Sequence, residues 1–409
     1  MSEWKELKIE DFCEVIGGGT PSTKEDSYYG GDISWITPRD LTNYKNRFIS
    51  RGERNISDLG LKNSSAKILP KNSILLTSRA PIGYLAIAEN EVCTNQGFKS
   101  LIVDAAKADY NFVYYLIKSN VERIKGLGTG TTFAEISGSV VKGLKFTIPN
   151  LPTQTAIAEI LSSLDDKIEL NNKINQELET LAQTLFKQWF IDFEFPNENG
   201  EPYKSSGGEM VESELGEIPN GWEVGSIYDI SSVIYGAPFK SSLFNQERKG
   251  YPLIRIRDLK TFKPQNWTEE VLSKGTKIQP GDLVVGMDAE FRPHFWLGEE
   301  GWLNQRVCLF KPKSEFSRLF VREIIRPLLA FYENSLVGTT VIHLGKGDID
   351  TFKSIIPSNH LSKLFTELSE PLINKIIENS RENESLRNLR DTLLPKLISG
   401  ELEINELPN

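Results

Sequence analysis

Two stretches of the chain carry apolar residues three and four positions apart over several helical turns. The first runs from Ile160 to Trp189, and the second repeats it 208 residues later, from Leu368 to Leu397. Such spacing is typical of a long amphipathic helix with an apolar seam. We therefore predict long helices within residues 151–195 and 358–409. The first seam comprises Ile160, Leu164, Ile168, Leu178, Leu181, Leu185 and Trp189, and the second Leu368, Leu372, Ile376, Leu386, Leu389, Leu393 and Leu397.

Asparagines recur in the middle of both seams, Asn171 with Asn379 and Asn175 with Asn383. A buried asparagine costs stability but fixes register, so we predict that residues 152–190 and 370–400 pack antiparallel, with Leu181 and Leu389 buried between them. The alternative is that each helix lies on its own domain. Two prolines interrupt the second pattern, and we expect Pro371 to delay its start and Pro395 to kink its end.

The segments before the two helices are also diverged copies of each other. Residues 1–150 and 221–357 share anchors in order, among them Arg39-Asp40-Leu41 with Arg257-Asp258-Leu259. Each copy mixes short β-rich runs with turn residues and one helix, near residues 110–125 or 318–334. The sequence therefore predicts an α+β fold of two globular domains separated by two long antiparallel helices, with an exposed linker over residues 196–220.

Length and charge narrow the possible functions. A chain of 409 residues is long enough for two or three domains. The net charge of -9 argues against a nucleic-acid binder, but residues 151–220 hold 14 acidic and only 4 basic groups, whereas residues 41–80 hold 8 basic and 2 acidic ones. One face can therefore be basic. Without a long apolar run or a leader-like start, we expect a cytoplasmic protein.

Residue patterns that would indicate catalysis are not found. No phosphate-binding GxxxxGK[ST] loop or Asn-Pro-Pro-aromatic methyltransferase signature occurs, and His294, His343 and His360 form no metal-binding spacing. Asp288, Glu290 and Arg292 faintly resemble a metal-dependent nuclease site, but the lysine is missing and the first copy has no equivalent. We therefore expect no catalytic residues, metal site or cofactor in this chain.

Both globular copies carry basic, amide and aromatic residues in predicted loops. Arginine and lysine can read guanine or phosphate, and asparagine and glutamine can read adenine. Two such DNA-reading domains on a rigid spacer suit two DNA half-sites about one helical turn, or about 34 Å, apart. A helix of about 36 residues is about 54 Å long, which is enough to hold the domains at that separation. The alternative for each residue is an ordinary solvated side chain. The candidates are Thr23, Lys24, Arg39, Lys45, Arg47, Ser78, Arg79, Tyr84, Asn95, Gln96 and Lys99 in the first copy, and Lys240, Ser241, Arg255, Arg257, Lys260, Phe291, Arg292, Trp296, Asn304, Gln305 and Arg306 in the second.

Over essentially its whole length the chain resembles the DNA-specificity subunits of type I restriction-modification systems. The resemblance is carried by Ile148–Leu170 and Leu185–Phe190, by Gly216–Trp222, and by Leu393–Leu402. Thr37–Leu41, Ser78–Tyr84 and Thr94–Phe98 are similar to the family's recognition domains. The second copy departs from this pattern at Gly286–Arg292, which in such proteins means a different DNA half-site.

The resemblance implies a non-catalytic subunit that binds a bipartite DNA site. Two methyltransferase subunits that use S-adenosylmethionine would dock on it, and restriction subunits that need ATP and magnesium would join the complex. From the residues themselves, we expect Phe186, Trp189 and Phe190 to lie on the outer helix faces and bind a partner. A different interpretation, based on the net acidity, is a coiled-coil scaffold that binds proteins without DNA.

Overall fold

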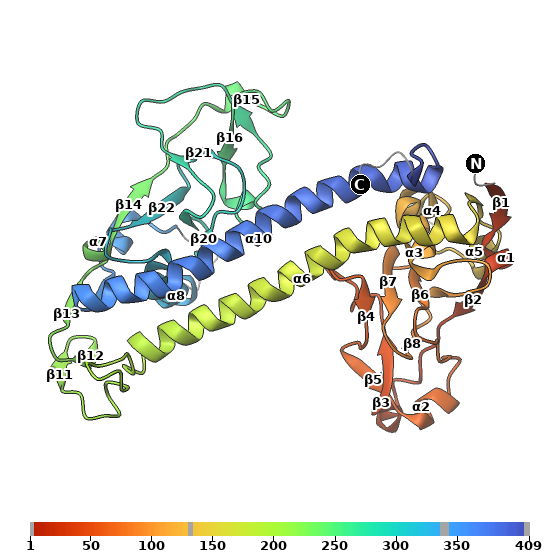
Figure 1. Cartoon of the computed structure of the whole chain (residues 1–409), viewed down its shortest axis with the longest axis horizontal. Coiled ribbons are helices and arrows are strands. Elements are labelled where there is room, and N and C mark those ends of the chain that lie inside the picture. Colours follow the sequence, from red (N-terminus) through yellow and green to blue (C-terminus); the bar gives the residue numbers. More distant parts are fainter. Residues whose placement is uncertain (1–3, 130–133, 336–342, 405–409) are drawn as a thin grey trace. The chain divides into compact units, whose positions relative to one another are not determined.

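The computed structural model describes residues 4–129, 134–335 and 343–404. The chain forms two compact units, which we call unit 1 (Met1–Glu169 with Glu384–Asn409) and unit 2 (Leu170–Asn383). Two long helices, α6 (Leu151–Phe190) and α10 (Asn359–Ser399), each have one part in unit 1 and the other in unit 2 (Figure 1). The α+β class predicted from the sequence is confirmed.

In its described residues, unit 1 is built on three small sheets and several short helices. A five-stranded sheet has the order β2-β9-β6-β7-β4, a three-stranded sheet has the order β5-β3-β8, and β1 pairs with β10. The strands are β1 (Lys5–Lys8), β2 (Cys13–Gly17), β3 (Tyr29–Ile36), β4 (Phe48–Ile49), β5 (Arg54–Ile56), β6 (Ile74–Ser78), β7 (Ile82–Ala88), β8 (Cys93–Thr94), β9 (Lys99–Val103) and β10 (Lys145–Ile148). The helices are α1 (Ile9–Phe12), α2 (Asp58–Lys62), α3 (Tyr110–Ser119), α4 (Val121–Lys125) and α5 (Gly138–Lys142).

Unit 2 contains a four-stranded sheet, β14-β22-β19-β20, and a five-stranded sheet, β15-β17-β16-β21-β18, while β13 pairs with β23 and β11 with β12. The strands are β11 (Met210–Ser213), β12 (Gly216–Pro219), β13 (Glu223–Ser226), β14 (Ser231–Tyr235), β15 (Phe244–Asn245), β16 (Tyr251–Ile254), β17 (Trp267–Thr268), β18 (Lys277–Ile278), β19 (Leu283–Gly286), β20 (Pro293–Phe295), β21 (Gly301–Leu303), β22 (Val307–Pro312) and β23 (Lys353–Ile356). The helices are α7 (Ile227–Ile230), α8 (Arg318–Ser335) and α9 (Lys346–Ile349).

Several strand pairings recur in the two units in the same register. Parallel strands β3 and β8 place Ile36 beside Thr94, and β16 and β21 place Ile254 beside Leu303. The antiparallel pair β2 and β9 is matched in the same way by β14 and β22. In each unit a helix follows this pair, and the residue directly before the helix caps its N-terminus. Asp109 caps α3 and the Ser317 hydroxyl caps α8, and each accepts the backbone N–H three residues ahead. The internal repeat is therefore a duplicated fold.

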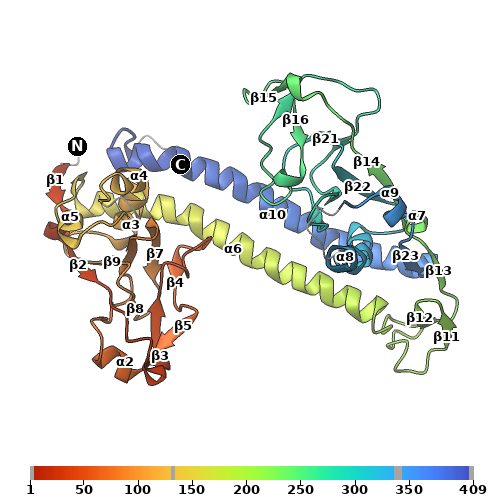
Figure 2. The same ribbon diagram turned by 180° about the vertical axis from the view of Figure 1, so that it is seen from behind.

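In each unit the segment of α6 lies beside the segment of α10 (Figures 1 and 2). The asparagines in the seams bond across the two helices in unit 2. Asn171 donates to the Asn383 side chain over 3.0 Å, and Asn379 donates to Asn175 over 2.9 Å. Because residue numbers rise along one helix as they fall along the other, the pair is antiparallel, as predicted.

Helix α10 begins earlier than the prolines suggested. It starts at Asn359, directly after Ser358, whose hydroxyl accepts the N–H of Leu361. Leu361 and Phe365 in the first turns are buried, and their burial offsets the hydrogen bond that Pro371 removes inside the helix. The prediction that Pro371 delays the start of this helix was therefore wrong.

Two further expectations about the helical region are corrected. Leu181 and Leu389 are 52% and 48% exposed rather than buried in the seam. The segment 196–220 is not an exposed linker along its whole length, because it forms β11 and β12 and buries Ile218. Phe195, just before it, stacks between the rings of Tyr203 and Trp222, with centroids 4.6 and 5.1 Å away.

Candidate nucleic-acid interface

Two loops of unit 1 pack tightly against each other beyond the ends of β2 and β8. A Cβ atom on Gly18 would lie 1.9 Å from the carbonyl oxygen of Asn95, so this approach requires glycine. The Asn95 side chain accepts the N–H of Gly97 over 2.8 Å. Thr20 on the first loop donates to the side chain of Gln96, which is exposed. Asn95 therefore shapes the turn, and Gln96 stands at its surface.

A carboxylate lies between two cations nearby in unit 1. Glu135 is 3.7 Å from the Arg79 guanidinium and 3.8 Å from the Lys99 ammonium. Arg79 follows β6, Lys99 opens β9, and Glu135 pairs with Arg79 through a short β-bridge. The three side chains are 35%, 17% and 42% exposed. The ends of two strands thus present two donors around one acceptor.

Unit 2 builds the same arrangement from different residues. Asp288 lies 3.6 Å from the Arg306 guanidinium and is bonded to Nδ1 of His343. Arg306 and His343 are 53% and 55% exposed, whereas Asp288 is 22% exposed. The β-bridge between Asp288 and His343 corresponds to the bridge between Arg79 and Glu135 in the repeat. The charge at this position is reversed between the units, since Arg79 follows β6 in unit 1 and Asp288 follows β19 in unit 2.

Most of the other predicted DNA-binding residues lie at the surface, some of them in ion pairs. Arg39 is 3.6 Å from Glu53, Lys260 is 2.8 Å from Glu290, and Arg292 is 3.9 Å from Glu333. The exposed candidates are Thr23, Lys24, Arg39, Lys45, Gln96, Lys240, Ser241, Arg257, Lys260, Arg292, Gln305 and Arg306. Partly exposed are Arg79, Tyr84, Asn95, Lys99 and Arg255.

Five predicted DNA-binding residues are buried, which removes them from the candidate interface. Arg47, Ser78 and Asn304 are 4%, 1% and 8% exposed. Phe291 and Trp296 are 1% and 0% exposed. The reason is internal bonding or packing: the Ser78 hydroxyl donates to a backbone carbonyl, the Trp296 indole donates to another, and Arg47 is paired inside unit 1.

The three aromatic residues predicted to bind a partner are also buried. Phe186, Trp189 and Phe190 are 6%, 4% and 2% exposed. Phe320 of α8 lies 4.8 Å from the Phe190 ring, and Phe365 of α10 lies 4.7 Å from it. The prediction of an aromatic partner surface was wrong because the core of unit 2 covers these side chains.

A different apolar feature is exposed at matching positions of the two long helices. Leu181 and Leu389 are 208 positions apart in the repeat and are both about half exposed. Each is flanked by partly exposed leucines three residues before and four after it. We call these sets the leucine stripes: Leu178, Leu181 and Leu185 in unit 2, and Leu386, Leu389 and Leu393 in unit 1.

Sequence reasoning missed several residues of the interface. Glu135 was not considered, Asp288 was considered only as a nuclease carboxylate, and His343 only as a metal ligand. Elsewhere in unit 1, the exposed cations Arg54, Lys62 and Lys67 were also not named as candidates. The excess of basic residues between 41 and 80 was the available signal for the last three.

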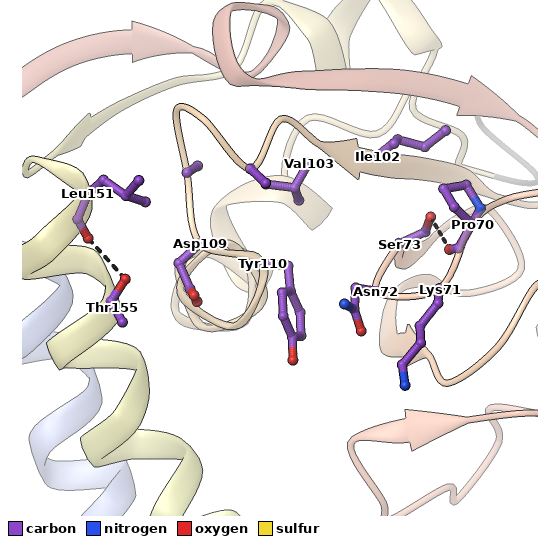
Figure 3. Close-up of a pocket in the computed structure, with 12 residues that line it drawn as sticks. Pro70, Lys71, Asn72, Ser73, Ile102, Val103, Asp109, Tyr110, Leu151 and Thr155 are labelled. Atoms are coloured by element: carbon purple, nitrogen blue, oxygen red, sulfur yellow. Dashed lines mark hydrogen bonds between the residues drawn. The ribbon is translucent and has the colours of Figure 1, made fainter.

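A hollow of about 480 Å³ lies elsewhere in unit 1 (Figure 3). It is lined by the turn before β6, the end of β9 and the first turns of α3 and α6. Tyr110 extends between Thr155 on one side and Asn72 on the other. Its lining residues include none of the predicted DNA-binding residues, so the hollow is separate from the candidate interface.

The residues that the structure describes contain no group of three or more histidines, cysteines or carboxylates placed to hold a metal ion. Glu290, from the faint nuclease pattern, is bonded to Lys260, and Asp288 to His343. Burial, reinforced by the nearby Arg292, lowers the pKa of His294. Among the described helices, none has both the length and the apolar character to cross a membrane.

Comparison with known proteins gives one consistent family. A family model described as the type I restriction modification DNA specificity domain matches residues 1–180 and 219–386. The specificity subunit of the type I restriction enzyme MjaIX from Methanocaldococcus jannaschii is 38% identical, over 99% of this chain and 95% of its own. The HindI specificity subunit from Haemophilus influenzae is 27% identical, over 98% and 100%. The crystal structure of an S subunit from M. genitalium shares the fold, with a TM-score of 0.62, 18% identity, and 97% and 96% of the chains covered.

Proposed function

The chain belongs to the family of type I restriction-modification DNA specificity domains, and from that premise we propose that it reads a bipartite, asymmetric DNA site, one half with each unit. The observation that carries this proposal is a duplicated fold with different donors at the same place. Unit 1 offers Arg79 and Lys99, and unit 2 offers Arg306 and His343. A different set of donors favours a different base sequence.

The ion pairs that Glu135 forms in unit 1 and Asp288 forms in unit 2 can open when DNA binds, so that their cations contact the DNA instead. Each joins side chains that remain partly exposed, at distances of 3.6–3.8 Å for the arginine and lysine contacts. Exposed pairs of this kind contribute about 0 to 1 kcal/mol, so separating them costs little. Guanine offers the arginines a two-bond contact that compensates for the lost pair.

The net acidity of the chain does not oppose DNA binding, because the exposed cations Lys45, Arg54, Lys62 and Lys67 lie in unit 1. Positions of this kind supply phosphate contacts that are independent of base sequence. Membership of a DNA specificity family also weighs against the alternative of an acidic scaffold that works without DNA.

We further propose that the chain has no catalytic residues and directs partner subunits to the site. The methyltransferase subunits would use S-adenosylmethionine, and the restriction subunits would use ATP and magnesium. The leucine stripes are the surfaces that we assign to the methyltransferase. Because the same stripe occurs on α10 in unit 1 and on α6 in unit 2, we expect two copies of this partner to bind each chain.

The proposal is tested by sequencing the methylated bases of a host that carries this chain with its methyltransferase partner. We expect one motif of two defined halves separated by an undefined spacer. Duplexes that carry this motif then serve to measure affinity. Arg79→Ala should weaken binding by about 1 to 3 kcal/mol if the guanidinium contacts a base, whereas Arg123→Ala, on the exposed side of α4, serves as the matched control.

Two results would contradict this function. The first is a methylome identical with and without the chain. The second is the absence of any DNA affinity at about 50 mM salt, where phosphate contacts are strongest, with the methyltransferase supplied.

A further inference from the structure

Arg47 ends the loop that joins β3 to β4 and is held there from three directions. Its guanidinium donates to the Tyr115 hydroxyl of α3 over 3.0 Å and to the carboxylate of Asp166 on α6. Its peptide N–H donates to Glu169, also on α6, over 2.6 Å, and its carbonyl accepts the N–H of Ile87 over 2.8 Å. The side chain is only 4% exposed. Both the main chain and the side chain of this residue are therefore fixed to the helices of unit 1.

The contacts behind Arg47 form a connected network of buried charges. Tyr115 donates in turn to Asp165 over 2.7 Å, and Asp165 pairs with Arg390 of α10 and with Lys118. Burial alone would raise the pKa of Asp165, but Lys118 and Arg390 outweigh it and lower the pKa. The carboxylate stays ionised, so the phenol of Tyr115 keeps donating to it and accepting from Arg47.

The other end of the same loop is fixed by Asp40. Its carboxylate accepts the N–H and the hydroxyl of Thr37 over 2.7 and 2.6 Å, and it accepts the N–H of Glu53 over 2.8 Å. Next to the first anchor the side chain of Arg39 is 83% exposed, and between the two anchors the side chain of Lys45 is exposed. The loop is thus a short exposed segment with candidate DNA contacts, held at both ends.

We propose that Arg47 is a positioning residue, which joins the recognition loop 38–47 to α6 and sets where that loop meets the first DNA half-site. The inference rests on the proposed function. It assigns to Arg47 a role without DNA contact, because a guanidinium already bonded to Asp166 and Tyr115 and shielded from solvent cannot reach a base or phosphate. Asp166 shares this role from the helix side.

The test uses the chain purified with its methyltransferase partner and three DNA duplexes. The first carries the motif found by methylome sequencing, the second carries that motif with its first half scrambled, and the third carries it with its second half scrambled. Arg47→Met keeps the aliphatic stem but loses the bonds to Asp166 and Tyr115. We expect the variant to bind the intact motif about 10- to 100-fold more weakly, the range of one base contact. It should lose discrimination at one half only and keep the wild-type salt dependence.

Three further variants separate positioning from other roles. Asp166→Asn, at a carboxylate that is 60% exposed, should reproduce the loss, and the double variant should be no weaker than either single variant. Arg47→Lys should restore part of the affinity through the remaining ion pair. Lys45→Met, two residues away on the same loop, is the matched control: it should lower the salt slope by about one and leave the preference between half-sites unchanged.

Several outcomes would overturn the inference. Unchanged discrimination in Arg47→Met would do so, as would a reduced salt slope, which indicates a direct phosphate contact, or wild-type behaviour of Asp166→Asn. Hydrogen exchange of residues 38–47 gives a measurement independent of DNA. Exchange should rise in Arg47→Met and in Asp166→Asn, and unchanged exchange counts against the inference. If the wild-type complex shows no sequence preference at all, the proposed function fails separately.

Discussion

Arg47 and Arg79 have the same charge and lie in the same unit, but burial gives them different roles. Arg47 is 4% exposed and is bonded to a phenol and a carboxylate. Arg79 is 35% exposed and faces Glu135 at 3.7 Å. A buried guanidinium must keep its partners because an unpaired buried charge is costly, whereas a surface pair exchanges partners freely. Residue type and loop position predicted both arginines as DNA contacts. Because these two properties do not reveal burial, only Arg79 remains in the interface.

Tyr115 should make the stability of unit 1 sensitive to alkali. Burial, with Asp165 acting in the same direction and Arg47 opposing, raises the pKa of Tyr115 well above its ordinary value of 10.0. Because the pKa of Tyr115 is higher in the folded than in the unfolded chain, the stability that its protonated phenol contributes is fully present below about pH 10. This contribution is lost as pH rises above 10, since the tyrosine of the unfolded chain releases its proton first. Denaturant unfolding at pH 9, 10 and 11 measures the effect.

Tyr115→Phe is the matched variant, because the phenyl ring fills the same space without a titrating proton. Near pH 11 the wild-type chain should lose about 1.4 kcal/mol more per pH unit than the variant, which corresponds to one proton. At neutral pH the variant should be the less stable protein, since it lacks the bonds to Asp165 and Arg47. Identical slopes for the two proteins above pH 10 would show that this phenol is not the group responsible.

On the scale of the helices, small differences between the two copies decide which face is buried. Ala182 on α6 is 0% exposed, and the residue at its place in the repeat, Arg390 on α10, has a side chain that is 14% exposed. These residues take the inward positions, so the neighbouring Leu181 and Leu389 turn outward. Apolar spacing of three or four cannot separate such adjacent positions over a helix of about 40 residues. The asparagine pairs were predictable because they recur in both seams.

The leucine stripes should hold the two methyltransferase subunits separately. Leu181→Glu or Leu389→Glu alone should reduce the assembly from two bound partners to one, and the double variant should bind none. The reason is that the interface would bury an unpaired carboxylate, which weakens one site at least tenfold, or about 1.4 kcal/mol. Native mass spectrometry counts the partners, and Val271→Glu, at a valine that is 74% exposed, is the control.

Because about half of each mutated leucine is already in water, the variants should keep their melting temperatures. Two methyltransferase copies bound to the double variant would exclude the stripes as docking surfaces. A loss that also occurs in Val271→Glu would point to a general effect of added charge.

For the whole molecule, the repeat made most of the fold predictable. The shifts of 218 residues between Arg39 and Arg257 and of 208 residues between Ile160 and Leu368 correspond to matched strand pairings in the two units. The interface was less predictable, since its pairs join residues far apart in sequence, such as Arg79 with Glu135 and Asp288 with His343. Loop spacing carries no information about such contacts, whereas matched apolar patterns do carry information about shared cores.

The purified chain should show no chemistry of its own on DNA. Incubation with DNA, S-adenosylmethionine, ATP and magnesium should give neither methyl transfer nor cleavage, and addition of the methyltransferase subunit should restore methylation of the motif. Incorporation of labelled methyl groups and gel analysis of the DNA provide the measurements. Methylation or cutting that persists after rigorous removal of partner subunits would contradict a purely directing role.

Exchange of one recognition domain should change one half of the methylated motif. Replacement of residues 1–150 by those of another family member ends just before α6 begins at Leu151, so both long helices and unit 2 keep their own sequence. The Arg47 contacts set a condition on this design. The incoming domain must carry an arginine that reaches Asp166, or the exchange must extend past Glu169.

When that condition is met, methylome sequencing should show a new first half, the original second half and the original spacer length. The reciprocal exchange of residues 221–357 should leave the first half intact, because the donors of unit 2, Arg306 and His343, belong to that segment alone. A motif in which both halves change after a single exchange would mean that the two units do not read DNA independently. Since each unit has its own buried core, independent reading is the outcome that the fold favours.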